Sequence, residues 1–147
     1  MPWPTEYQQA QVDFVRFMVA ARDAAGLQTT NMAWNMVEGV LHVFRRRLKT
    51  SDAVCFANVL PPVLRALFLE GWCPKDPVPF LARPLMTAEV KALRPDHNFS
   101  PETAIDAVAK ALWLCVDNER LTQVLEKLPS EAAHFWNPDA PPAYSED

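Results

Sequence analysis

The sequence of 147 residues contains only 3 glycines, and no glycine-rich phosphate-binding loop is present. Its 3 cysteines include no CxxC pair, which argues against a disulfide framework or a zinc site. No apolar run reaches the roughly 20 residues that span a bilayer, and a formal net charge of −4 does not attract nucleic acid or anionic membrane. The opening MPWPTEYQQ lacks the features of a signal peptide. We therefore expect a cytoplasmic protein that binds neither nucleic acid nor membrane.

Proline is abundant, at 14 residues, and its clusters are typical of breaks between helices. Half of the residues are hydrophobic, which is enough to form a core. Runs of β-branched residues, which would favour a sheet, are few. The sequence predicts a single all-α domain over residues 1–137. The acidic, proline-rich segment 138–147 is expected to be a flexible tail.

Apolar residues at helical spacing predict a first helix over residues 5–25, buried on most sides. A second helix is expected from about residue 30 to 49. Its basic end, RRRLK, is interpreted as a solvated terminus that suits the helix dipole. The stretch FLARPLMTAEVKAL predicts a helix interrupted at Pro84 and restarted by Thr87.

The sequence contains an internal repeat of its apolar pattern. Leu60-Pro61 and Leu128-Pro129 lie 68 positions apart, and the same shift aligns the apolar residues of their flanking helices. A shift of 71 aligns the preceding long helices, which predicts matching helices over residues 32–48 and 101–115. We infer two tandem helical units, about 5–72 and 78–137. One unit alone cannot bury its apolar face, so the two are expected to pack into one bundle.

The stretches that carry a family resemblance are VLHVFRRRL, DAVCFANVLPPVLRALF and AVAKALWLCVDNERLTQVLEKLPSEAAHFW. They resemble the bacterial domain of unknown function 2267 family (DUF2267), up to about residue 137. The resemblance implies an all-helical fold of tandem units. It implies no activity and supplies no catalytic residues. The stretch FLARPLM departs from the family pattern.

Two Glu–His pairs have spacings that place both side chains on one helix face, namely Glu38 with His42 and Glu131 with His134. A di-iron bundle would need a second Glu-x-x-His pair and two further glutamates pointing into the core. His42 belongs instead to a polar stripe, and an acid in a first turn, such as Glu131, suits the helix dipole. We predict no metal and no cofactor.

Two loop residues, His97 and Cys73, are candidates for reactive groups. His97 lies beside Asp96, but the sequence marks no nucleophile for it, so no catalytic residue is assigned. Cys73 precedes Lys75 and is interpreted as an inert thiol, while its redox activity stays open. Cys55 and Cys115 are expected to be small buried hydrophobic residues.

The shift of 71 places Trp113 on His42, a position in the polar stripe of the first unit. We expect the stripe at Ala109, Trp113 and Val116 to be covered by the chain itself or by a partner, which makes these residues a possible interface.

These observations favour a non-enzymatic interaction or scaffold module with an unknown protein partner or a second copy, as in a homodimer. The alternative is a binder of a small apolar ligand between the two units. The residues expected to line that cavity are Met18, Met32, Met36, Trp34 and Trp113.

Overall fold

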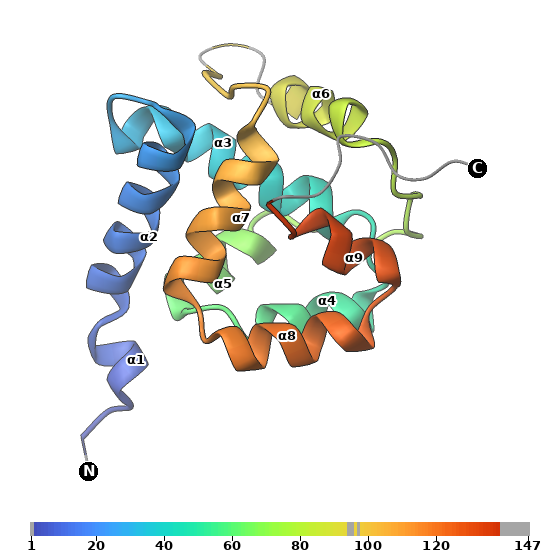
Figure 1. The fold of residues 1–147 in the computed structure, drawn as a ribbon. Helices are drawn as coiled ribbons and strands as arrows, with labels where there is room; N and C mark the ends of the chain where they lie inside the picture. Colours follow the sequence, from blue (N-terminus) through green and yellow to red (C-terminus); the bar gives the residue numbers. More distant parts are fainter. Residues whose placement is uncertain (1, 94–95, 97, 139–147) are drawn as a thin grey trace.

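The computed structural model describes residues 2–93, 96 and 98–138. Throughout these residues all regular structure is helical, which confirms the predicted all-α class (Figure 1). The helices are α1 (Thr5–Gln8), α2 (Ala10–Ala25), α3 (Thr30–Arg45), α4 (Thr50–Ala57), α5 (Pro62–Leu69), α6 (Arg83–Leu93), α7 (Ala104–Cys115), α8 (Asn118–Lys127) and α9 (Ser130–Phe135). No helix in the described ranges is both long and apolar enough to cross a membrane.

The predicted first helix is two helices. α1 stops at Gln8, and Gln9 adopts φ −105° and ψ 17°, which separates it from α2. The prediction that this region is buried on most sides is wrong. α2 lies along the edge of the molecule and packs against α7 and α3 (Figure 1). Its outer face has no neighbouring element among the described residues, and Val12 is 67 % and Val15 49 % exposed.

The core is one continuous cluster that draws on both predicted units. At its centre the ring of Phe44 from α3 lies 4.9 Å from Phe56 of α4, 5.0 Å from Phe135 of α9 and 5.2 Å from Trp136. Phe56 stacks on Trp136 at 5.7 Å. Such aromatic contacts add to the free energy gained by burying the rings. The two halves of the chain are therefore held together by shared packing.

The helix at residues 83–93 is not interrupted. Pro84 is the second residue of α6, where proline is tolerated because first-turn amides need no helical partner, so the predicted break is wrong. α6 crosses α3 closely at Gly39, where an added Cβ would come within 2.9 Å of Val90 Cγ1. Arg83 is buried, and its Nη2 donates to the carbonyl oxygens of His134 and Phe135 in α9.

The basic end of the second predicted helix is not a solvated terminus, so that interpretation is wrong. α3 ends at Arg45, and the side chain of Arg47 is buried. Arg47 donates to both carboxylate oxygens of Glu89 in α6, at 3.0 and 2.6 Å, and to the carbonyl of Val43 at 2.8 Å. Glu89 of α6 and the Val43 carbonyl of α3 thus supply the acceptors that a buried guanidinium needs.

The order of one long and two short helices occurs in α3–α4–α5 and again in α7–α8–α9. Leu60 and Leu128, which precede the two matching prolines, are both buried. That the two segments superpose with Leu60 on Leu128 stays a prediction.

Candidate functional site

A groove of about 440 Å³ lies where α7, α8 and α9 meet. Its lining residues are Trp113, Thr122, Leu125, Glu126, Ala133, Asn137 and Pro138. The surface is largely apolar, and its volume lies within the range of about 300–1,000 Å³ that is typical of ligand pockets. The groove can therefore receive an apolar side chain or a small apolar molecule.

Trp113 forms one wall of the groove. Its indole is half-buried and packs against the core, and its Nε1 donates a hydrogen bond of 2.7 Å to the carbonyl oxygen of Trp136. This bond satisfies the polar edge of the indole and fixes its orientation. An oriented aromatic ring is a typical anchor surface at protein interfaces.

The opposite wall comes from α8, whose first turn is capped by Asp117. The Asp117 carboxylate accepts from the backbone amides of Glu119 and Arg120 at 3.0 and 3.2 Å, which satisfies donors that have no helical partner. Arg120 in turn donates to the carbonyl of Asn58 at 2.9 Å and fastens α8 to the end of α4. The wall is thus held on the body of the protein.

The third side of the groove is α9. Ala133 lies on its exposed surface and lines the groove, and its side chain ends at Cβ. The helix itself is anchored at its carbonyl end by Arg83 and Trp113. The groove is therefore open at this point because α9, which is held firmly in place, carries only a short side chain at position 133.

The three residues of the predicted interface differ in their exposure. Ala109 is fully buried and Val116 is buried, both under other parts of the same chain, whereas Trp113 lines the groove. The other lining residues come from α8, α9 and the segment after α9, which sequence reasoning missed. One signal was present in the sequence: position 133 is alanine, whereas the matching position 65 is arginine.

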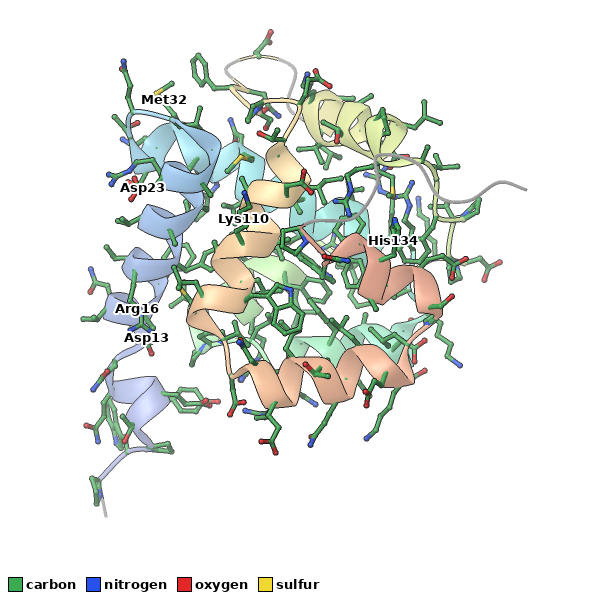
Figure 2. The ribbon with its side chains drawn as sticks, in the orientation of Figure 1. Asp13, Arg16, Asp23, Met32, Lys110 and His134 are labelled. Carbon is green, nitrogen blue, oxygen red and sulfur yellow. The ribbon has the colours of Figure 1, made fainter. Side chains whose placement is uncertain are left out.

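The five residues of the predicted ligand cavity do not gather in one place. Met18 and Met36 are buried in the core, and Trp34 lies at the surface with its ring 5.9 Å from that of Phe14. Met32 lies near the start of α3, far from the groove (Figure 2). Trp113 is the member of this set that lines the groove.

His42 is a structural residue in this fold. It is half-buried, and its Nε2 donates to the carbonyl oxygen of Leu67 at 2.9 Å. Burial holds the pKa of His42 below its ordinary value, which favours the neutral ring. Glu38, Glu131 and His134 are also engaged in interactions. His97 lies outside the described residues, and within those residues no group of three or more His, Cys, Asp or Glu side chains could hold a metal ion.

The cysteines are free thiols. Cys73 is exposed, as is Cys55, so the expectation that Cys55 is buried is wrong. It falls on the outer face of α4, where its neighbours in sequence are apolar but its own side chain points away from the core. Cys115 is half-buried, and burial raises the pKa of its thiol.

The fold and the groove define an all-helical domain with an apolar recess on one side. The sequence matches the family model described as "Uncharacterized conserved protein (DUF2267)" over residues 14–135, which is most of the chain, so the protein belongs to this family. No curated protein matches the sequence. The family match confirms the resemblance and does not assign an activity. Residues 2–13, which include α1 and the start of α2, precede the matched region.

Proposed function

We propose that the protein is a non-enzymatic interaction module of the cytoplasm that associates with a second copy of itself. In this proposal, the groove beside Trp113 of each copy receives apolar side chains from the N-terminal segment, residues 2–15, of the other. The observation that carries the proposal is the presence of both complementary parts, an apolar groove and an unburied apolar helix, on one chain. Free cysteines are consistent with a reducing compartment.

The N-terminal segment exposes several large apolar side chains. Trp3 is 74 % and Tyr7 50 % exposed, and Val12 and Val15 continue the apolar surface onto α2. α1 buries no residue against its own chain. Contiguous exposed apolar side chains of this kind mark interaction surfaces.

Polar contacts at one edge hold α1 in place. Arg65 Nη1 donates to the hydroxyl of Tyr7 at 3.2 Å, and Arg65 Nη2 lies 3.8 Å from the carboxylate of Glu6. These contacts are partly exposed, so they orient the helix without contributing much stability. The apolar side chains of Trp3 and Val12 are left available to a partner.

The position of the two parts suits a symmetric pair. In Figure 1, α1, the last turn of α7 and α8 all lie on the lower side of the molecule. Leu114, near the end of α7, is 76 % exposed. A twofold axis through this side would let each copy give its N-terminal segment and receive the other's. Closed twofold dimers of this kind are the commonest oligomers.

The energies favour a dimer of modest affinity. Burying one large apolar side chain contributes about 1.5–3 kcal/mol, and three anchors from each copy (Trp3, Tyr7 and Val12) would contribute roughly 9–18 kcal/mol. Association costs about 4–15 kcal/mol in lost freedom of motion. Mid-range values, about 13.5 kcal/mol gained and about 9.5 kcal/mol lost, leave a surplus of about 4 kcal/mol, which corresponds to a dissociation constant of about 1 mM.

The test uses Ala133→Arg, which gives α9 the residue that α5 has at the matching position. Arginine is a good helix former and Ala133 is exposed, so the fold should be unchanged while the groove is filled. Sedimentation velocity should show a monomer–dimer equilibrium for the wild type and a monomer for this variant. The matched control, Ala92→Arg on the exposed face of α6, should dimerise like the wild type.

Two results would contradict the proposal. A wild type that stays monomeric at millimolar concentration excludes self-association, and a dimer that persists in Ala133→Arg excludes the groove. Trp3→Ala should also abolish the dimer, because it removes the largest anchor of the N-terminal segment.

A small apolar ligand is the second candidate for the same groove. The volume of about 440 Å³ and the mainly apolar lining favour it. Native mass spectrometry distinguishes the two proposals: a bound molecule would add mass to the monomer of the wild type, and Ala133→Arg would remove that mass.

A further inference from the structure

A second cleft, of about 430 Å³, lies between the end of α3 and the linker that follows α5. Its walls include Arg45, the last residue of α3, Arg46 directly after it, and Trp72, Lys75 and Asp76 from the linker. It shares no lining residue with the groove beside Trp113. The cleft is therefore a separate feature, and the proposed dimer does not account for it.

Backbone contacts set the shape of this cleft. The chain leaves α5 through Gly71, whose φ of 65° is in the left-handed region that glycine adopts without strain. The linker then returns to α3, where the amide of Val78 donates to the carbonyl of Arg46 at 3.1 Å. The linker is held at both ends, so its side chains face the end of α3 in a fixed arrangement.

Arg45 is built into the wall. It is only 9 % exposed, and its Nη1 donates to the carbonyl oxygens of Phe68 at 2.8 Å and Glu70 at 2.9 Å. Its guanidinium lies 5.4 Å from the centre of the Trp72 ring, a cation–π contact. Both hydrogen bonds use Nη1, which leaves the donors of Nη2 for a ligand in the cleft.

The cleft is positive on a protein that is negative as a whole. Arg45, Arg46 and Lys75 line it with Asp76 as the acidic residue, whereas the chain carries a formal charge of −4. Arg46 is only partly neutralised, because its partner Glu89 also pairs with Arg47. The carbonyl end of α3 contributes about half a negative charge, which is less than the surplus of cations.

We propose that this cleft binds the phosphate group of a small molecule. Arginine matches phosphate geometry with paired N–H donors, and an anion would relieve the repulsion between the neighbouring Arg45 and Arg46. That repulsion, together with the larger effect of burial, lowers the pKa of Arg45. Trp72 offers the ligand little ring surface, since Arg45 already lies over the indole.

The surroundings favour a small ligand over a nucleic acid. A neighbouring hollow of about 350 Å³ shares His42 and Arg45 with the cleft and is lined by Glu38 and Glu70. These carboxylates would repel the repeated phosphates of an extended polyanion, whereas a single phosphate group can stay within the basic part.

The experiment titrates the full chain with inorganic phosphate at constant ionic strength and follows the thermal midpoint. Phosphate should raise the midpoint of the wild type, because a ligand that binds the folded state stabilises it. Lys75→Glu in the exposed linker should weaken phosphate binding by about tenfold, since it removes one attraction and adds one repulsion, each worth roughly a factor of three. Lys110→Glu on the exposed face of α7 makes the same charge change elsewhere and should bind phosphate like the wild type.

Arg46→Gln gives a second route to the same loss without altering the linker. No phosphate-dependent shift in the wild type, or an equal loss in Lys75→Glu and Lys110→Glu, would overturn the proposal. A short single-stranded oligonucleotide that binds more tightly than phosphate, and that the same two cleft variants weaken, would overturn it in favour of nucleic acid.

Discussion

The segments α3–α5 and α7–α9 each fix the end of their last short helix, but they use different side chains. In each, a residue of the long helix hydrogen-bonds a carbonyl near the end of the last short helix. His42 Nε2 donates to Leu67 at 2.9 Å, and Trp113 Nε1 donates to Trp136 at 2.7 Å. These contacts satisfy backbone acceptors that a helix end leaves without partners. In the first segment the donor is a titratable imidazole, and in the second it is an indole that does not titrate.

The same comparison explains why the groove lies on only one of the two segments. Arg65 in α5 donates from Nε to Ala57 at 3.1 Å and from Nη2 to Leu60 at 2.9 Å, so its side chain covers the junction of α4 and α5. Ala133 stands at the matching position in α9 and has nothing to extend over α8. The groove therefore results from the short side chain at position 133 and requires no extra element.

The aromatic residues at the ends of α5 and α9 give the largest predicted difference. Trp136 contacts the rings of Phe44, Phe56 and Phe135, whereas Phe68 contacts Phe56 alone among the described rings. We expect Trp136→Ala to lower the free energy of unfolding by about 4–5 kcal/mol and Phe68→Ala by about 3 kcal/mol. Urea denaturation followed by circular dichroism measures both.

A control separates ring volume from hydrogen bonding. Trp136 Nε1 is buried without a hydrogen-bond partner among the described residues, so Trp136→Phe should cost far less than Trp136→Ala. If Phe68→Ala proved the more damaging change, the ring contacts of Trp136 would not be the larger contribution to the core.

The second prediction concerns the long helices. Gly39 of α3 touches α6 at Val90, and the shift of 71 places Lys110 of α7 at the same position, where the side chain is exposed. Gly39→Val should cost about 1–3 kcal/mol, because the new side chain meets both Val90 Cγ1 and the Val90 carbonyl oxygen, which lies 3.2 Å from an ideal Cβ.

The matched change Lys110→Val should alter stability by only about 0.5 kcal/mol. Thermal unfolding of the two variants under one set of conditions gives the comparison. Equal losses of stability in the two variants would show that the contact between Gly39 and α6 is no closer than the surroundings of Lys110.

The sequence was a good guide to the long helices. Apolar spacing predicted helices over 32–48 and 101–115, and α3 (Thr30–Arg45) and α7 (Ala104–Cys115) lie close to these ranges. Period and capping are local properties, so they can be read without knowing the neighbours. Thr29, for example, accepts a hydrogen bond from the Met32 amide at 3.1 Å, as expected of a helix cap.

The errors arose where burial depends on what packs nearby. Arg47 looked like a surface residue because nothing local shows that Glu89 will face it 42 positions later. Val12 has the spacing of a core residue, but no element among the described residues covers that side of α2. The groove was missed for a related reason: an alanine at position 133 has meaning only once α7 and α8 are placed beside it.

The smallest predicted difference is a pH dependence of the contact that His42 makes in the first segment. Burial lowers the pKa of His42, and Arg45 and Arg46 lower it further, while the Leu67 carbonyl and Glu38 act in the opposite sense. When the pKa of a histidine is lower in the folded than in the unfolded protein, the folded protein favours the neutral ring. Its contribution is therefore complete above the unfolded pKa of about 6.5 and is lost as the pH falls towards the folded value.

The variant His42→Gln tests this effect, since glutamine keeps an N–H donor for Leu67 and does not titrate. Between pH 7.5 and 5.5 the free energy of unfolding should fall more steeply for the wild type than for His42→Gln. The difference between the two proteins isolates His42 from the other histidines and from the carboxylates. A variant with Trp113→Phe should keep the wild-type slope, because the second segment makes the matching contact without a titratable group. Parallel curves for the wild type and His42→Gln would show that His42 has the same pKa in both states and that the two contacts respond alike to pH.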